Sequence, residues 1–221
     1  MSDMASLHHG KGGQGTARAH MGHARRHGLL AEVFFAGRRR RVYTELAILS
    51  GAQPGGCVLD VGCGDGYFTR VMAERVGPNG TAHGVDISPE AIKSAARLSR
   101  QANCSFSVGT AESLDPPEGS FDVVVSALMV HHLEEAARPR AIEEMSRVLR
   151  PGGHLLLAEF RPPATPLGKL LAAPFASQAM RHNPVQLLEP MVRDAGFVQT
   201  STGRLRPWVY YVQATKPLAA A

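Results

Sequence analysis

The sequence contains few cysteines, few aromatic residues and no long apolar segment. Only three cysteines and one tryptophan occur in 221 residues, and aromatic residues make up 6% of the chain. The odd number and unpaired spacing of Cys57, Cys63 and Cys104 favour reduced thiols over disulfides or a zinc site. No apolar segment approaches the roughly 20 residues of a membrane span. The polar amino terminus lacks the apolar core of a secretory signal, so we expect a cytoplasmic protein.

The excess positive charge is confined to the first quarter of the chain. Residues 1–50 contain eight Lys/Arg and three Asp/Glu, whereas residues 51–221 contain sixteen of each. A nucleic-acid groove over the body would need Lys and Arg clustered on one face. The balanced charge of residues 51–221 therefore argues against a nucleic-acid partner.

The most informative stretch is residues 57–66, Cys-Val-Leu-Asp-Val-Gly-Cys-Gly-Asp-Gly. It begins as an apolar run with β-branched residues, which is typical of a buried strand, and ends in three alternate glycines. Phe68, Val71, Met72 and Val76 then recur at helical spacing. Glycine suits a turn with positive φ or with a ligand against the main chain, and the next helix offers free N–H groups there. The stretch thus predicts a strand, a ligand-binding turn and a helix.

This stretch resembles the first motif of class I S-adenosylmethionine-dependent methyltransferases, hydrophobics-Asp-x-Gly-x-Gly-x-Gly, with Asp60 at its acidic position. The resemblance covers about residues 40–160 and includes the Leu-Arg-Pro-Gly-Gly at 149–153. It implies S-adenosyl-L-methionine as methyl donor and S-adenosyl-L-homocysteine as product. The alternative is an NAD-dependent oxidoreductase, which would use Asp86 in the same way, but its fingerprint needs a glycine where Tyr67 stands.

Alternating strand and helix signals predict one α/β domain with a mostly parallel sheet. The resemblance implies a doubly wound, Rossmann-like sheet of seven strands between two helix layers, with the last strand antiparallel. Strands are expected at 57–61, 81–86, 104–108, 121–126, 154–160, 197–202 and 208–215. Helices are expected directly after the glycine turn, from residue 88 onward, and at 136–149 and 187–196. We expect a mobile tail at 1–17, a helical cover at 18–51 and a methyltransferase domain at 52–221, whose insertion 161–183 covers the pocket.

Asp86 ends the second expected strand, where ligands bind in open parallel sheets, and its carboxylate can accept hydrogen bonds from two ribose hydroxyls. Ser88-Pro89-Glu90 already provides the start of the next helix. The resemblance implies that residues after the third strand flank the adenine and that those after the fourth approach the sulfonium. The expected donor-binding residues are Asp60, Gly62, Cys63, Gly64, Asp65, Gly66, Asp86, Ile87, Thr110, Ala111, Glu112, Ser126 and Ala127.

Methyl transfer requires alignment, exclusion of water and often a base for the acceptor's proton. His131 and His132 follow the fourth strand, and histidine titrates near neutral pH, so either is a candidate catalytic base. The alternative is that the pair only packs the loop. The resemblance also implies that the N-terminal segment and the insertion cover the acceptor. The expected acceptor-binding residues are His27, Phe34, Phe35, Tyr43, Met129, Phe175 and His182.

The pattern around the fourth strand restricts the chemistry. Residues 126–133 contain no Asp, Glu or Asn, so we predict no metal site there, and the Asn/Asp-Pro-Pro-aromatic tetrad of amide and adenine methylation is absent. The resemblance is greatest to ubiquinone/menaquinone-biosynthesis methyltransferases and their small-molecule relatives. The apolar cover expected from residues 28–43 and 162–182 favours a small aromatic or apolar acceptor, with O-methylation favoured and C- or N-methylation open. We expect Arg38–Arg41 to form the solvated start of a helix; an anionic partner, a membrane surface or a nucleic-acid substrate is the alternative.

Overall fold

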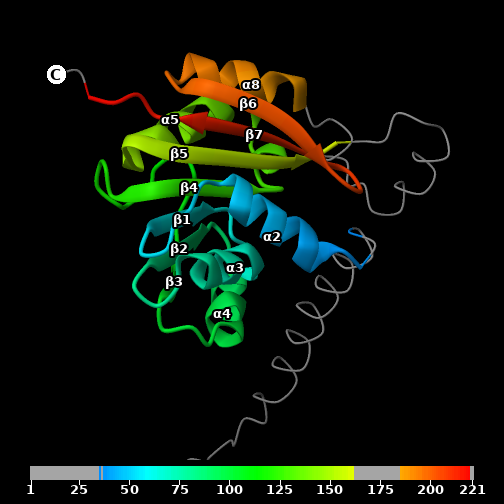
Figure 1. Ribbon diagram of the computed structural model, residues 1–221, viewed down its shortest axis with the longest axis vertical. Coiled ribbons are helices and arrows are strands. Elements are labelled where there is room, and N and C mark those ends of the chain that lie inside the picture. Colours follow the sequence, from blue (N-terminus) through cyan, green and yellow to red (C-terminus); the bar gives the residue numbers. More distant parts are fainter. Residues whose placement is uncertain (1–34, 36, 162–184, 220–221) are drawn as a thin grey trace, which may run out of the picture.

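The computed structural model describes residues 35, 37–161 and 185–219. Their strands form one seven-stranded sheet in the order β3-β2-β1-β4-β5-β7-β6 (Figure 1). The strands are β1 Cys57–Val61, β2 Thr81–Asp86, β3 Cys104–Val108, β4 Phe121–Ala127, β5 Leu149–Phe160, β6 Val198–Leu205 and β7 Val209–Thr215. Strands β1 to β5 pair in parallel, whereas β7 runs antiparallel to both β5 and β6. The predicted α/β class and the antiparallel last strand are confirmed.

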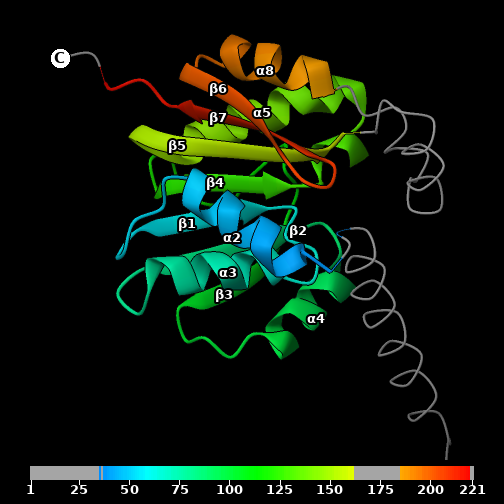
Figure 2. The ribbon, with the colours of Figure 1, turned by 45° about the vertical axis from the view of Figure 1, so that its right-hand side comes forward.

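Helices cover both faces of the sheet and complete three layers (Figures 1 and 2). The helices α2 Arg39–Leu49, α3 Tyr67–Val76 and α4 Pro89–Leu98 lie on one face, and α5 Arg138–Val148 and α8 Val185–Asp194 lie on the other. Successive side chains of a strand point to opposite faces of the sheet, so the strands contribute to a hydrophobic core on each face. Val123 and Val125 pack with α2 and α3, and Val124 packs with α5 and α8. In the described part of the chain, no helix is long and apolar enough to cross a membrane.

Strand β5 begins earlier than the sequence predicted. It starts at Leu149, directly after α5, because Leu149 pairs with Phe121 of β4. The Pro-Gly-Gly that follows lies in a register shift of the β4–β5 pairing, which resumes at Val123 and His154. On the other edge of β5, the N–H of Gly152 donates to the carbonyl of Lys216 (3.0 Å) and the N–H of Lys216 donates to the carbonyl of Gly153 (2.8 Å). Residues 130–132 and 135–137, between β4 and α5, form two 3₁₀ turns, η1 Val130–His132 and η2 Glu135–Ala137.

Helix α2 confirms the helix predicted after the arginine run, but one arginine is not solvated. Arg39 is only 8% exposed, whereas Arg38, Arg40 and Arg41 are exposed. The reason is helical spacing: residue 39 shares a stripe with positions 42, 43 and 46, all of which are buried against the sheet. The expected tail 1–17 and nearly all of the expected insertion 161–183 lie outside the described residues.

The loop after β3 is tied to α5 by a partly buried ion pair between Glu144 and Arg147. Glu144 accepts hydrogen bonds from Arg147 (2.8 Å) and from the backbone N–H of Leu114 (2.9 Å), and Arg147 also donates to the carbonyls of Leu114 and Pro116. Hydrogen bonding from Arg147 lowers the pKa of Glu144 from 4.5 to about 2. The pair fixes the loop that leaves the Thr110–Glu112 region for β4.

We expect the substitution Glu144→Gln to lower the free energy of unfolding at neutral pH by up to about 3 kcal/mol, the equivalent of this pKa difference. Because the folded-state pKa is depressed, the stabilisation is complete above the unfolded value of 4.5 and is lost as the pH falls toward about 2. Urea unfolding from neutral pH down to about pH 3 should show the gap between wild type and variant narrowing. The exposed Glu143→Gln is the matched control, and a constant gap would contradict the assignment.

Candidate active site

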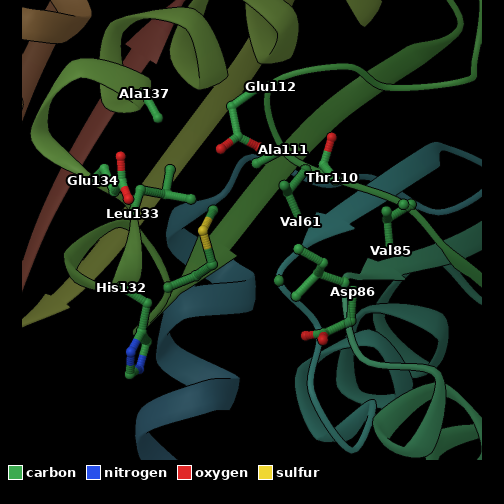
Figure 3. Close-up of a pocket in the computed structure, with 14 residues that line it drawn as sticks. Val61, Val85, Asp86, Thr110, Ala111, Glu112, His132, Leu133, Glu134 and Ala137 are labelled. Atoms are coloured by element: carbon green, nitrogen blue, oxygen red, sulfur yellow. The ribbon is translucent and has the colours of Figure 1, made fainter.

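A cavity of about 350 Å³ lies at the carboxyl ends of β1 to β4, where the strand order reverses (Figure 3). Its volume is within the range of small-molecule sites. The lining residues come from the ends of β1 and β2, from the segments that follow the four strands, and from the end of η2, just before α5. They are Val61, Gly62, Val85, Asp86, Ile87, Gly109, Thr110, Ala111, Glu112, Met129, His132, Leu133, Glu134 and Ala137.

The glycine turn after β1 forms one side of the cavity. Gly62 has φ +76°, and a Cβ there would lie 2.1 Å from Cγ of Met129. Gly66 has φ +72° at the N-cap of α3, and its Cβ would lie 2.5 Å from the ring of Phe106. Both positions therefore require glycine, for conformation and for space. Gly64 differs, because a Cβ there would meet open space, which leaves its main chain accessible to a ligand.

Asp86 lines the cavity at the end of β2 and is bonded to the turn. Its Oδ2 accepts the N–H of Gly64 (2.8 Å), and its Oδ1 accepts the N–H of Ser88 (2.9 Å). Ser88 caps α4 through its own hydroxyl, as predicted. A carboxylate offers about four lone-pair positions, so Asp86 retains acceptor capacity toward the cavity after making these two bonds. This geometry suits a ligand that presents neighbouring hydroxyl groups.

Asp60 and Cys63 lie beneath the turn rather than in the cavity. Asp60 is 1% exposed and accepts a hydrogen bond from the hydroxyl of Thr69 (2.7 Å). Burial raises the pKa of Asp60 to about 7. Cys63 is also buried, and burial raises the pKa of its thiol, so the side chain is neutral and unreactive at neutral pH.

The segment that follows β4 packs against the glycine turn after β1. Leu128 adopts φ +58°, which is unfavourable for leucine, and its N–H donates to the carbonyl of Ala158 in β5 (2.8 Å). This backbone bend directs Met129 against Gly62. Ser126 is buried, and its hydroxyl donates to the carbonyl of Val61 (2.8 Å), so the hydroxyl joins β4 to β1 and does not face the cavity.

The two histidines after β4 occupy different environments. His131 is 4% exposed, and its Nδ1 lies 2.6 Å from Oε2 of Glu159, whose other oxygen accepts the N–H of Val130 (2.7 Å). Its Nε2 is buried and makes no hydrogen bond. His132 lines the cavity (Figure 3). Its ring centroid lies 4.1 Å from that of His131. Partial burial, and then the neighbouring His131, lower the pKa of His132 below its ordinary value of 6.5.

The structure brings most, but not all, of the expected residues to this site. The cavity is lined by the expected residues Gly62, Asp86, Ile87, Thr110, Ala111, Glu112, Met129 and His132. Gly64, Asp65 and Gly66 belong to the turn beside it, and Ala127 ends β4. Phe35 and Tyr43 do not line this cavity; they are buried in the core beneath α2, where the Tyr43 ring packs on Phe35 and Phe68. His27, Phe34, Phe175 and His182 lie outside the described residues.

Two residues near the site escaped sequence reasoning, Glu159 and Arg39. Glu159 is the one carboxylate in strand β5, and it is 1% exposed. A lone carboxylate in a central strand is unusual, and the sequence could have indicated a special role for Glu159 on that ground. Arg39 was hidden in a run of four arginines, and only the helical stripe distinguishes it. Among the described residues, no group of three or more His, Cys, Asp or Glu side chains is arranged to hold a metal ion.

Comparisons with known proteins agree with this geometry. The family described as "Methyltransferase domain" matches residues 58–153. A relative from Ectopseudomonas mendocina, "Ubiquinone/menaquinone biosynthesis C-methyltransferase UbiE", is 34% identical over 203 residues, covering 79% of this chain and 77% of its own. The chain belongs to the S-adenosylmethionine-dependent methyltransferases. This membership decides against the NAD-dependent oxidoreductase.

Two further matches extend the comparison. The methyltransferase also resembles "Nocamycin O-methyltransferase" of Saccharothrix syringae, with 36% identity over 56% of this chain and 45% of the relative. A solved S-adenosylmethionine-dependent methyltransferase from Aquifex aeolicus has the same fold, with a TM-score of 0.67 and 19% identity, over 78% of this chain and 88% of that one.

The residues present fit S-adenosyl-L-methionine, which supplies an electrophilic methyl group on a positively charged sulfur. Asp86 is suited to its ribose hydroxyls, and Ile87, Ala111 and Leu133 give the cavity apolar surface for a base. Gly64 leaves room over the turn for the amino-acid portion. The carboxylates of Asp86 and Glu112 favour a cationic ligand over a neutral one.

We expect Asp86→Ala to weaken binding of S-adenosyl-L-homocysteine by about 100-fold, because hydrogen bonds to a charged group contribute about 1.5–3 kcal/mol each. Titration calorimetry measures the affinity, and thermal unfolding reports any loss of the bonds to Gly64 and Ser88. Asp115→Ala, an exposed carboxylate in the loop before β4, is the control. Unchanged affinity in the Asp86 variant would remove the ribose assignment.

Proposed function

We propose that this methyltransferase acts on a small aromatic acceptor that carries a phenolic hydroxyl group. The observation that carries the proposal is the histidine pair after β4, in which His132 lines the donor cavity and His131 is anchored to the buried Glu159. A phenol becomes a far better nucleophile when its proton is removed, so a neutral histidine beside the methyl donor suits this class of acceptor.

His132 is the proposed base. It lines the cavity, and its lowered pKa keeps the imidazole neutral, and therefore able to accept a proton, at neutral pH. Anchoring of His131 by Glu159 supports the ring on which His132 packs. His131 itself is a positioning residue in this proposal, since its side chain is fully buried.

The phenolic oxygen is the proposed site of methylation, and the ring carbon is the second candidate. The relative from Saccharothrix syringae is named an O-methyltransferase, which supports methylation of oxygen. The relative from Ectopseudomonas mendocina is named a C-methyltransferase, which supports methylation of carbon. Deprotonation of a phenol activates both atoms, so the same base serves either outcome. A nucleic-acid substrate receives less support, because Arg39 is turned away from the surface and interrupts the arginine run. The cytoplasmic location and the covering role of residues 18–51 and 161–183 stay predictions.

A screen with donor carrying a deuterated methyl group tests the proposal. Phenols, hydroquinones and aliphatic or aromatic amines are offered separately, and products are detected by the mass increase. Fragmentation then distinguishes a methyl ether from a ring-methylated product. Turnover of amines alone would overturn the proposed acceptor class.

We expect His132→Ala to lower kcat about 100-fold, within the range of general-base catalysis, with little change in affinity for S-adenosyl-L-homocysteine. In the wild type, kcat/KM should rise with pH through a value below 6.5, because protonation of His132 removes the base, and this acidic limb should disappear in the variant.

His131→Ala is the matched comparison. It leaves the buried Glu159 without its histidine partner, so the main expected effect is a loss of stability of about 1–3 kcal/mol, with the acidic limb retained. Equal kcat in the His132 variant at every pH would remove His132 from the mechanism.

A further inference from the structure

The sheet has two outer edges, and one of them is protected against pairing with another chain. Strand β6 forms this edge, and its pairing with β7 shifts register between Val198 and Ser201. Gln199 in this irregular stretch has φ +51°, and Arg204 farther along the strand is exposed. Irregular register and charged side chains are features by which edge strands avoid the addition of a further strand.

Strand β3 forms the other edge and has neither feature. In the described part of the chain it pairs with β2 alone, through five consecutive residue pairs without a register shift. Its sequence, Cys-Ser-Phe-Ser-Val, contains no charged residue and no proline. Val108 at its end is 47% exposed, and Leu98 at the end of the neighbouring helix α4 is 50% exposed. This edge is therefore regular, uncharged and flanked by exposed apolar side chains.

The backbone of β3 presents hydrogen-bonding groups on its outer side. The N–H of Gly109, directly after the strand, donates to the carbonyl of Asp86 in β2 (3.1 Å). Successive N–H groups of a strand point to opposite sides, so those of Phe106 and Val108 point away from β2. Such an outer row is a template for strand addition, in which main-chain hydrogen bonds hold an extended peptide.

Helix α4 adds positive charge beside this edge. The helix packs against β3 and lies at the same end of the sheet (Figures 1 and 2). Lys93 and Arg97 are four residues apart and so share one face of α4, and Arg100 follows the helix before β3 begins. All three are exposed, and none forms an ion pair with another described residue. The outer side of β3 and these three side chains form what we call the β3–α4 surface.

The charge of the β3–α4 surface distinguishes between its possible occupants. A second copy of this chain, paired strand to strand about a twofold axis, would place its own α4 beside this α4 on the same face of the joined sheet. Lys93 and Arg97 would then approach their counterparts, and such contact between like charges is unfavourable. An acidic segment in extended conformation matches both the backbone groups and the charge.

We propose that the β3–α4 surface binds an acidic, extended segment of a partner protein, which pairs with β3 as an added strand. The backbone of this segment bonds to the outward groups of Phe106 and Val108, and its carboxylates face Lys93 and Arg97. This partner site goes beyond the proposed function, because it depends on neither the acceptor nor the catalytic base.

Two synthetic peptides that differ in charge test the proposal on the full chain. Each has about ten residues, enough to span β3 at about 3.3 Å per residue, and alternates valine with either glutamate or lysine. The alternation places all charged side chains on one face of an added strand. In fluorescence anisotropy, wild type should bind the glutamate peptide about 10-fold more tightly than the lysine peptide, with a preference that declines as salt is added.

Variants of the strand and of the helix separate the two contributions. Val108→Pro removes an outward N–H and keeps the bonds to β2, a position at which edge strands tolerate proline, and it should weaken binding of the glutamate peptide about 10-fold. Combining Lys93→Glu with Arg97→Glu should reverse the preference between the peptides. Arg204→Glu, an exposed arginine on the β6 edge, is the matched control and should bind as wild type does. Thermal unfolding monitors the fold of each variant.

Residue-resolved amide hydrogen exchange distinguishes strand addition from simple attraction to a charged helix. The bound glutamate peptide should slow exchange at Phe106 and Val108, because their N–H groups point outward. Peptide binding that leaves both amides unchanged would reduce the contact to electrostatic attraction and overturn the strand assignment.

Three other results would overturn the proposal. The first is the absence of binding by wild type at millimolar glutamate peptide. The second is tight binding of single-stranded RNA that the Lys93→Glu and Arg97→Glu combination abolishes, which would assign the basic face to nucleic acid. The third is a dimer in light scattering that Val108→Pro dissociates, which would assign the edge to a second copy of the chain.

Discussion

The site depends on three hydrogen bonds that attach the glycine turn to the end of β2. The N–H groups of Gly62 and Cys63 both donate to the carbonyl of Val85, and the N–H of Gly64 donates to Asp86. These bonds fix the main chain between two parallel strands at the point where the sheet opens. The accessible main chain at Gly64 and the Asp86 carboxylate therefore keep a constant spacing, and a ligand meets a surface that is already formed.

The donor side of the site and the side proposed for the acceptor are built by different means. The donor side uses backbone and strand-end residues, which the sheet holds rigidly. The side that we propose for the acceptor uses the bent segment after β4, in which Leu128 takes an unfavourable conformation and Glu159 receives both the N–H of Val130 and the ring of His131. Local strain of this kind is maintained only when the surroundings supply compensating contacts, and here β5 supplies them. The same sheet can thus keep its donor while its acceptor segment varies.

The donor side could be predicted from sequence because its signals are local. The spacing of three glycines, an acidic residue at a strand end and the Ser-Pro-Glu helix start each lie within a few residues, and Asp86 and Ser88 stand as expected. Arg39 and Tyr43 could not be placed, because their surroundings come from α3, about 25 residues later in the chain. The role of Glu159 follows only from the pairing of β5 with β4, which places its carboxylate beside His131. Side-chain roles that depend on packing between distant segments could not be predicted from the local sequence pattern.

The contact between Met129 and Gly62 has a consequence for engineering. The turn has no side chain at position 62, so the flexible thioether side chain of Met129 fills the junction between the donor side and the side proposed for the acceptor. Shortening that side chain would widen the junction without disturbing the main chain of either strand. Position 129 is accordingly the first to vary in a search for catalysts that transfer ethyl, allyl or bulkier alkyl groups from synthetic sulfonium reagents.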